Sequence, residues 1–361
     1  MAEAQKTKAK EVTFNSTLSS NDKIALISNF HTMLVSGIPI LETVDSLLED
    51  SKGSQKKLLQ TLHQDLSQGQ HMYITFAKFP KIFDKVTVSI IKSAEESGTL
   101  DTALDDLKSN IRKEIEFNDK IRSALIYPAF ILGVFILVMV VILVVVIPKI
   151  STVFLQLNVT LPLPTKIMIF MSNFLLTYTI PLIVAVIILI AVCFYLFKQY
   201  KIFFVRVFTS LPLVSLLTEQ IDLTRFTRSL YLLLTAGLPI TVALELTQDV
   251  VIKKNISNAI KHAKNNVFSG KKLSEGFKDS KKVIPPIMIK IIEAGERSGA
   301  LDKSMLEVSE YLDYQVSNTL KAVTAMIEPI MIVGVGILIG GMMMAIIAPI
   351  YQLIGQISPS S

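Results

Sequence analysis

Hydrophobic and polar positions follow a helical period through much of the chain. Near the N-terminus, apolar residues recur at spacings of three and four behind the capping sequence "SSND", which predicts a helix that begins near Asp22 and ends at Gly37. Similar patterns predict helices through residues 40–50, 55–66 and 83–97, and a long helix from residue 100 to the first apolar run. No pattern indicates a strand, so the polar parts of the chain are predicted to form bundles of five to six helices.

Three long apolar runs interrupt this pattern. Residues 129–147 and 330–348 contain no charged residue, and residues 167–197 form a longer run with Pro181 near its middle. A helix needs about 20 apolar residues to cross the hydrocarbon core, so each run is predicted to span a membrane. In the longest run, tilt or a proline kink takes up the excess length.

Composition supports a membrane protein. Hydrophobic residues make up 51% of the chain and charged residues only 18%, which is more apolar than an ordinary soluble domain. The first eighteen residues are polar and lack the apolar core of a secretory signal peptide. The single cysteine, Cys193, excludes an intramolecular disulfide.

The chain also repeats itself. The phrase "SAEESGTLD" at 93–101 returns as "AGERSGALD" at 294–302, and "MLVSGIPI" at 33–40 returns as "LLTAGLPI" at 233–240. Because the offset stays at 200 or 201, these phrases indicate two copies of one unit rather than a short-period repeat. The longest apolar run has no counterpart in the duplication. Its expected role is to return the chain across the membrane, so that both copies lie on the same side.

Lysine and arginine residues indicate which side that is. They precede the first apolar run and follow the second, whereas the segment between these runs holds only two and the tail after the third run holds none. The positive-inside rule therefore predicts that the N-terminus and both copies are cytoplasmic. The predicted segments are a flexible tail (1–18), copy one (19–127), a span (128–148), an external loop (149–166), a second span (167–197), copy two (198–328), a third span (329–350) and an external tail (351–361).

The repeated phrase predicts a corner between two helices. Gly98 or Gly299 closes a helix in the left-handed conformation, a leucine then returns to the core, and an aspartate caps or enters the first turn of the next helix. A carboxylate at the aligned positions Glu95 and Glu296 is not needed for such a corner, so a contact with a partner stays open beside a purely structural role. The candidate residues of the two corners are Glu95, Ser97, Gly98, Leu100 and Asp101, and Glu296, Ser298, Gly299, Leu301 and Asp302.

Two further groups of candidate residues are structural. The "GIPI" and "GLPI" phrases predict turns built by glycine and proline, and the third span holds two glycines four residues apart, which permit close packing of helices. The turn residues are Gly37, Pro39, Gly237 and Pro239, and the residues at or in the membrane are Pro128, Glu328, Pro329, Gly336 and Gly340.

The order and spacing of these phrases resemble the inner-membrane platform proteins of type IV pili and type II secretion systems, the PilC/GspF family. The resemblance rests on the two turns, the two corners, the prolines before the first and third spans, and "LPLPT" at 161–165, and it extends over about residues 20–352. It implies an all-α, polytopic, non-enzymatic assembly platform in the bacterial inner membrane. Such a platform is expected to contact a cytoplasmic hexameric ATPase, pilins or pseudopilins, and other inner-membrane assembly proteins.

The residues themselves indicate no enzyme. The chain lacks a G-x-x-x-x-G-K-[ST] phosphate loop, its histidines lack metal-ligand spacing, and no nucleophile adjoins an evident base, so no catalytic, cofactor or metal site is predicted. The carboxylates of Asp101, Asp105 and Asp106 either hold a cation or form a solvated helix face. The alternative function is a small transporter built from duplicated halves, although three spans are few and carry almost no ionisable groups.

The two copies differ in charge. Residues 1–127 contain 16 basic and 17 acidic residues, whereas residues 198–328 contain 18 and 13, with the excess in residues 253–282. This basic segment either contacts anionic lipid or an acidic partner, or only solvates its helices. The contrast suggests different neighbours for the two copies. We further expect a homo-oligomer in contact with membrane lipid, without a nucleic-acid partner; the glycines of the third span pack against another span, a second protomer or a pilin helix.

Overall fold

The computed structural model describes residues 13–156, 163–178 and 212–357, together with the isolated positions 181, 184, 188 and 192. Most of these residues are helical and none of them lies in a strand, which confirms the all-α prediction. The predicted tail at 1–18 falls mostly outside the described residues, as do most of the second span and Cys193. Of the second span, the structure describes mainly its beginning, in helix α8 (Leu163–Thr177).

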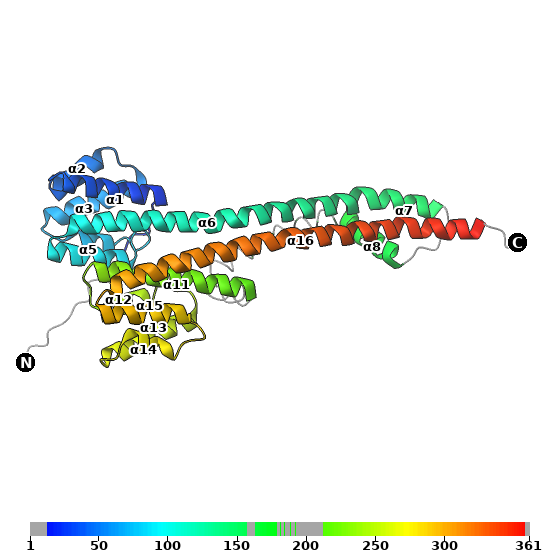
Figure 1. Ribbon diagram of the computed structural model, residues 1–361. Coiled ribbons are helices and arrows are strands. Elements are labelled where there is room, and N and C mark those ends of the chain that lie inside the picture. Colours follow the sequence, from blue (N-terminus) through cyan, green and yellow to red (C-terminus); the bar gives the residue numbers. More distant parts are fainter. Residues whose placement is uncertain are drawn as a thin grey trace, which may run out of the picture. The chain divides into compact units, whose positions relative to one another are not determined.

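Copy one consists of six helices (Figure 1). The side chain of Ser19 accepts a hydrogen bond from the backbone N–H of Asp22 and so caps the first helix, as the capping sequence predicts. The helices are α1 (Ser20–Val35), α2 (Ile40–Glu49), α3 (Gly53–Ser67), α4 (Met72–Ala77), α5 (Lys85–Ser97) and α6 (Leu100–Val141).

Copy two repeats this order of helices. Three successive helices, α13 to α15, match α3 to α5 in length and lie 201 residues later in the chain. The helices of copy two are α11 (Pro212–Thr235), α12 (Ile240–Thr247), α13 (Lys254–Phe268), α14 (Leu273–Lys278), α15 (Pro286–Ser298) and α16 (Leu301–Ile357). The duplication read from the sequence is therefore a duplication of structure.

The short helices α4 and α14 are absent from the sequence prediction, which treated the segment around Pro80 as a loop. Each has only six residues, too few to show a helical period. Isolated helices of this length are unstable in water, so these two depend on contacts with the rest of their copy.

The chain divides into two compact units, described separately here. The first consists of residues up to Lys120 together with Leu216–Ser317, and thus contains the cores of both copies. Its buried apolar side chains form one continuous cluster, with Phe30, Phe76 and Leu104 from copy one and Phe226, Phe277 and Val308 from copy two. Hydrogen bonds also join the copies, since Ser93 Oγ donates to the carbonyl oxygen of Ala236 at 2.9 Å. The two copies, predicted as separate bundles, thus pack as one body.

The second unit consists of Ile121–Ser215 and Asn318–Ser361. Within the described residues, two helical stretches, Leu100–Thr152 and Leu301–Gly341, are long and apolar enough to cross a membrane. Their most apolar parts are only 11% and 0% buried. A helix in water rarely exposes so much apolar surface, whereas a helix in lipid does. The first stretch contains the first predicted span, and the second stretch contains the larger part of the third, up to Gly341. The second predicted span is not confirmed.

The helices extend further than the sequence predicts. Residues 149–156, expected in a loop, belong to α7 (Ile147–Gln156), and residues 351–357, expected in a tail, belong to α16. A π-helical turn, Ile142–Val146, joins α6 to α7. The proline at position 148 has no backbone N–H to donate, and a wider turn before it accommodates this loss without ending the helix.

Candidate functional site

The repeated corner has the same backbone in both copies. Gly98 and Gly299 each have φ of 73°, the left-handed conformation that closes α5 and α15. The next backbone N–H groups, of Thr99 and Ala300, return to the carbonyl oxygens of Ala94 and Gly295 at 2.9 and 3.0 Å. This arrangement satisfies carbonyl groups that a helix end leaves free.

The other residues of the phrase support the same corner. Leu100 and Leu301 begin the following helices and pack against the core, and Asp101 and Asp302 lie in their first turns. Acidic side chains at a helix N-terminus interact favourably with the helix dipole. The hydroxyl groups of Ser97 and Ser298 donate to backbone carbonyl groups of their own helices.

Glu95 and Glu296 have a structural partner that the sequence does not indicate. The carboxylate of Glu95 accepts hydrogen bonds from the backbone N–H groups of Met72 (2.7 Å) and Tyr73 (2.9 Å), at the start of α4. The carboxylate of Glu296 does the same at the start of α14, where Leu273 and Ser274 are the donors. The capping residues of α4 and α14 supply no side-chain acceptor. The repeated glutamate therefore caps a helix 22 and 23 residues earlier in the chain.

This cap changes the interpretation of the glutamates. The side chain of Glu95 is only 10% exposed, so it is not a free contact residue at the surface. The expectation that no carboxylate is needed beside the corner missed this role, because the helix that the carboxylate caps was itself missed. The sequence contains a weak signal for this role. A glutamate occupies the same place in both copies, and the segment before the capped helix has a glycine at the same place in both, Gly69 and Gly270.

A coupled difference between the copies lies next to the corner. Gly295 of α15 packs so closely on α16 that a Cβ atom added to it meets Ser304 Oγ at a distance that cannot be occupied. Copy one has Ala94 at the equivalent position, and the residue there that is equivalent to Ser304 is Ala103, which is also buried. The change from alanine to glycine thus accompanies a larger residue on the facing helix.

The two repeat turns also share one backbone. Gly37 and Gly237 have φ of 81° and 78°, and the prolines that follow, Pro39 and Pro239, directly precede α2 and α12. Neither proline carries a backbone N–H, which is no loss at the start of a helix. These residues therefore shape the turn and present no reactive group.

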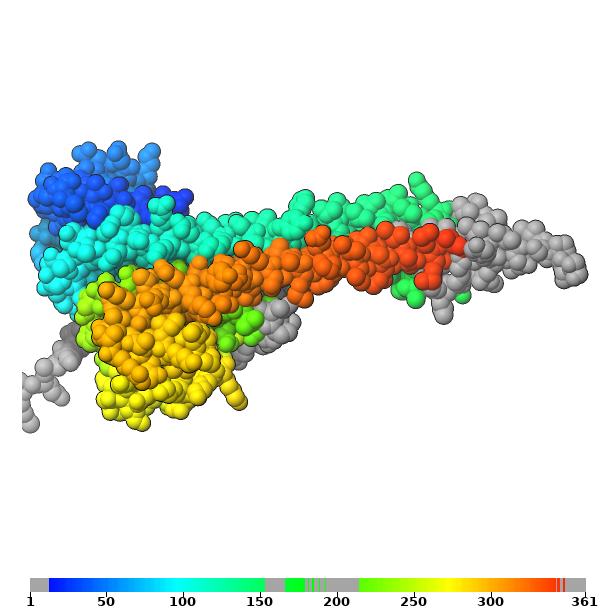
Figure 2. Space-filling view, viewed as in Figure 1, coloured from blue at the N-terminus to red at the C-terminus, as the bar shows by residue number. Residues whose placement is uncertain are grey.

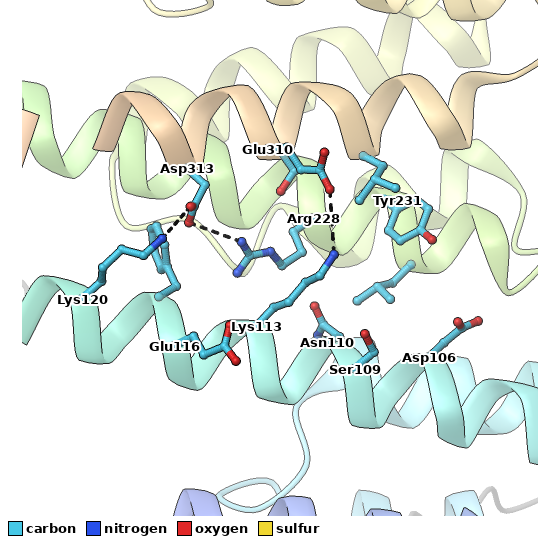
Figure 3. Close-up of a pocket in the computed structure, with 14 residues that line it drawn as sticks. Asp106, Ser109, Asn110, Lys113, Glu116, Lys120, Arg228, Tyr231, Glu310 and Asp313 are labelled. Carbon is cyan, nitrogen blue, oxygen red and sulfur yellow. Dashed lines mark hydrogen bonds and ion pairs between the residues drawn. The ribbon is translucent and has the colours of Figure 1, made fainter. Parts of the chain in front are cut away.

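A polar groove of about 280 Å³ lies between α6 of copy one and helices α11 and α16 of copy two (Figure 3). Its walls carry both signs of charge. Lys120 Nζ lies 2.9 Å from Asp313 Oδ2, Arg228 Nη2 lies 3.7 Å from Asp313 Oδ1, and Lys113 Nζ lies 3.9 Å from Glu310 Oε1. Lys113 and Lys120 of copy one pair with carboxylates of copy two, whereas Arg228 and Asp313 both belong to copy two. Two ion pairs of the groove therefore join the copies.

Arg228 is the most buried charge in this groove, with 14% of its side chain exposed. Burial lowers the pKa of the guanidinium, while the neighbouring carboxylate of Asp313 opposes this effect. The guanidinium also lies over the ring of Phe117, 5.3 Å from its centre. Asp106, at the edge of the groove, has a raised pKa because of burial and the nearby charge of Asp105.

Asp222 of α11 is a second buried charge. It is fully buried, and its Oδ2 accepts hydrogen bonds from the backbone N–H groups of Ile252 (2.9 Å) and Lys253 (2.6 Å), just before α13. Its Oδ1 has no hydrogen-bond partner among the described residues. Burial raises the pKa of Asp222, and the two backbone donors act in the opposite direction. Asp222 connects α11 to α13 and is another residue that the sequence analysis did not single out.

One carboxylate of the acidic cluster at the start of α6, that of Asp105, is paired with a lysine. Asp105 Oδ1 pairs with Lys108 and lies 3.4 Å from His31 Nε2, and Lys108 lowers the pKa of Asp105. Among the residues searched, no group of three or more histidine, cysteine or acidic side chains could hold a metal ion.

The candidate residues at the membrane have few partners in the second unit. Pro128 and Pro329 lie inside α6 and α16, which continue through them, and Glu328 is exposed. Cβ atoms added to Gly336 and Gly340 meet nothing within 4 Å, whereas one on Gly334 lies 3.7 Å from the ring of Phe135. Within the part of the chain that the structure covers, the two predicted packing glycines thus face open space.

Together these features define a duplicated helical protein in which the first helix after each capped corner continues into an apolar stretch long enough to cross a membrane. Comparison with known families agrees with this class. The family described as "Type II secretion system (T2SS), protein F" matches the chain twice, at residues 26–148 and 226–349. The chain belongs to this family, which confirms both the resemblance drawn from the motifs and the duplication.

Individual relatives come from pilus and secretion systems. The chain is 29% identical to the type IV pilus assembly protein PilC of Thermus thermophilus over 335 aligned residues. The aligned region covers 91% of this chain and 81% of that protein. PilC of Pseudomonas aeruginosa is 28% identical over 326 residues, with 89% and 87% covered. The type II secretion system protein F of Vibrio cholerae is 23% identical over 353 residues, with 97% and 87% covered.

Proposed function

We propose that this protein is a non-enzymatic platform in the bacterial inner membrane for a type IV pilus or a type II secretion system. In this proposal the two copies lie in the cytoplasm and receive the motion of a hexameric assembly ATPase, which the spans pass to pilins or pseudopilins. The names of the relatives support the choice of system. Membership of the secretion-protein family also favours a platform over the alternative of a small transporter.

One structural observation supports the transmission of movement. The helix that follows each corner is also the helix that carries an apolar span: α16 runs without a break from Leu301 to Ile357, and α6 runs from Leu100 to Val141. A continuous helix rises about 1.5 Å per residue and is stiff over this length. A displacement of its cytoplasmic part therefore reaches the span without passing through a flexible linker.

An insertion experiment tests this role. Seven residues inserted after Arg122 lengthen α6 by about two turns, which nearly restores the original rotation of the span. A helical insertion such as EAAAKEA should preserve much of the pilus assembly or secretion, whereas seven residues of glycine and serine should abolish it. Both variants should still co-purify with the ATPase of the same system. Equal output from the two insertions would contradict transmission along the helix, and the absence of any complex with the wild-type protein would contradict the ATPase as partner.

Thiol labelling tests the proposed orientation. In a Cys193→Ser chain, a cysteine at Ser54 or Lys271 should be protected from an impermeant thiol reagent in intact spheroplasts, and a cysteine at Lys166 should react. Protection should disappear when the membrane is opened with detergent. Reaction of Lys271→Cys from outside would show that the two copies do not share the cytoplasmic side.

A further inference from the structure

The duplication provides an internal control for surface features. Wherever the two copies share a backbone, a feature that the fold requires is expected in both. The turn between α3 and α4 has the same hydrogen bond as the turn between α13 and α14: Gln70 N–H donates to Asp65 O at 2.9 Å, and Lys271 N–H donates to Asn266 O at 3.0 Å. Exposed side chains that differ between such matched turns are not explained by the fold.

The α13–α14 turn of copy two carries an exposed aromatic ring beside two cations. Phe268 is 65% exposed, and Lys271 and Lys272 follow it at the surface. Copy one has Ser67, Gln70 and His71 at these positions. The cations form no ion pair with any residue that the structure describes. We call Phe268, Lys271 and Lys272 the basic turn; it belongs to the segment drawn in yellow, which forms part of the surface in Figure 2.

The α1–α2 corner of copy one has the opposite charge. Val35 is 61% exposed and Leu41 37% exposed, and the exposed carboxylate of Glu42 follows them. The backbone is again matched, since Ile38 N–H and Leu238 N–H each donate to the carbonyl oxygen five residues earlier at 3.0 Å. At the three positions copy two has Thr235, Thr241 and Val242 and thus lacks the carboxylate. We call Val35, Leu41 and Glu42 the acidic corner.

From these two surfaces we propose that the basic turn of one molecule binds the acidic corner of a second copy of this chain. Each surface combines exposed apolar area with charge, and the charges are complementary, which favours association of these two surfaces over association of like with like. Anionic lipid or an acidic partner would account for the basic turn but would repel the acidic corner. A second copy accounts for both surfaces, because every molecule carries both.

This contact is head-to-tail. The surface that each molecule offers differs from the surface that it binds, so the contact closes a ring or extends an open chain, according to the rotation between neighbours. The contact is small and contains solvent-exposed charges, so it weakens with salt. Confinement of the chains in a membrane raises their effective concentration and makes a weak contact sufficient. The proposal does not depend on the ATPase or on the transmission of movement.

Disulfide cross-linking of full-length protein tests the contact. In a Cys193→Ser background, Glu42→Cys and Lys271→Cys are made as separate single-cysteine chains with tags of different size, reconstituted together and oxidised. A mixed dimer is expected from this pair. The matched controls are the equivalent positions of the other copy: Gln70→Cys in place of Lys271→Cys, and Val242→Cys in place of Glu42→Cys. Mixed dimers of equal yield in the controls would show random collision, and dimers from either single-cysteine chain alone would show a symmetric contact; either result overturns the proposal.

Exchange of residues between the copies provides a second test that preserves the fold. Phe268→Ser/Lys271→Gln/Lys272→His places the residues of copy one on copy two, and Val35→Thr/Leu41→Thr/Glu42→Val does the reverse. Each variant should raise the dissociation constant for self-association at least tenfold, measured in proteoliposomes by energy transfer between labelled copies at varied protein-to-lipid ratio, and should leave the melting temperature nearly unchanged. Unchanged self-association in either variant, including the case in which only binding to anionic vesicles is lost, would overturn the proposal.

Discussion

The carboxylate of Glu95 accepts a hydrogen bond from the backbone N–H of Met72 at 2.7 Å, and this contact links the end of α5 to the start of α4. Because the same contact recurs between Glu296 and Leu273, the repeated phrase joins three helices in each copy rather than two. The corner glycine sets the direction of the following helix, and the glutamate beside it holds the preceding short helix in place.

Removal of this cap should destabilise the protein. Glu95→Ala leaves two backbone donors of α4 without their acceptor, which should cost about 1–2 kcal/mol, and Glu95→Lys should cost more because it adds a cation at the positive end of the helix. The neighbouring Glu96→Ala is the control, since that side chain is 60% exposed and its one ion pair among the described residues is with Lys92, at 3.9 Å. Thermal unfolding of the detergent-solubilised protein measures the difference. Normal melting of Glu95→Ala together with loss of assembly would instead indicate a docking role.

The corner glycines should tolerate only residues that accept positive φ. At Gly98 and Gly299 nothing lies within 4 Å of an added Cβ atom, so the cost of substitution comes from the backbone and not from crowding. A change to valine should cost roughly 1 kcal/mol or more in either copy, whereas a change to asparagine should cost clearly less. Chemical denaturation of the four variants provides the comparison, and equal losses for valine and asparagine would show that conformation is not the cause.

Gly295→Ala should be destabilising because of crowding and not because of backbone conformation. Its Cβ atom overlaps Ser304 Oγ, so α15 and α16 must move apart. The double change Gly295→Ala/Ser304→Ala recreates the pair that copy one has in Ala94 and Ala103, and it should restore part of the loss. Ser304→Ala alone is the control. If the change in melting temperature of the double variant equals the sum of the changes of the two single variants, the two positions are not coupled.

The groove between the copies should depend on Asp313 more than on Glu310. Loss of the Asp313 carboxylate leaves the partly buried Arg228 without the carboxylate that lies nearest to it and removes the partner of Lys120, which should cost about 1–3 kcal/mol. Glu310 is exposed and lies at the longer distance from its lysine, so Glu310→Ala should have little effect. A Tm for Asp313→Ala equal to that of Glu310→Ala would show that the ion pairs of Asp313 contribute no more to stability than the exposed pair of Glu310.

The buried aspartate should make stability depend on pH. Burial raises the folded-state pKa of Asp222 above its unfolded value, so the folded protein binds the proton more tightly and this contribution to stability is lost as pH rises through the folded pKa. Asp222→Asn keeps an acceptor for Ile252 and Lys253 and avoids the buried charge. The free energy of unfolding of Asp222→Asn should equal or exceed that of the wild type at pH 7. As the pH falls, the stability of the wild type should increase relative to that of the variant.

Denaturation curves from pH 4 to pH 7.5 measure this change in the difference in stability between the wild type and Asp222→Asn. Asp222→Ala serves as the control, since it loses the acceptor at every pH and should be the least stable throughout. A constant difference between wild type and Asp222→Asn over the whole range would contradict a raised pKa.

The sequence by itself determined the helical class, the duplication, the left-handed glycines and two long apolar helices. Each of these depends on residues close together in the chain: a period of 3.6, a glycine after a helix, or an uninterrupted apolar run. Only the tertiary structure decided the role of Glu95 and Glu296, the pairing of Gly295 with Ser304, and the ion pairs that join Lys120 and Arg228 to Asp313. These contacts join residues on different helices, and the pair of Lys120 with Asp313 joins the two copies. Local pattern carries no information about which distant backbone donor or charge a side chain will meet, because that is set by how the helices pack.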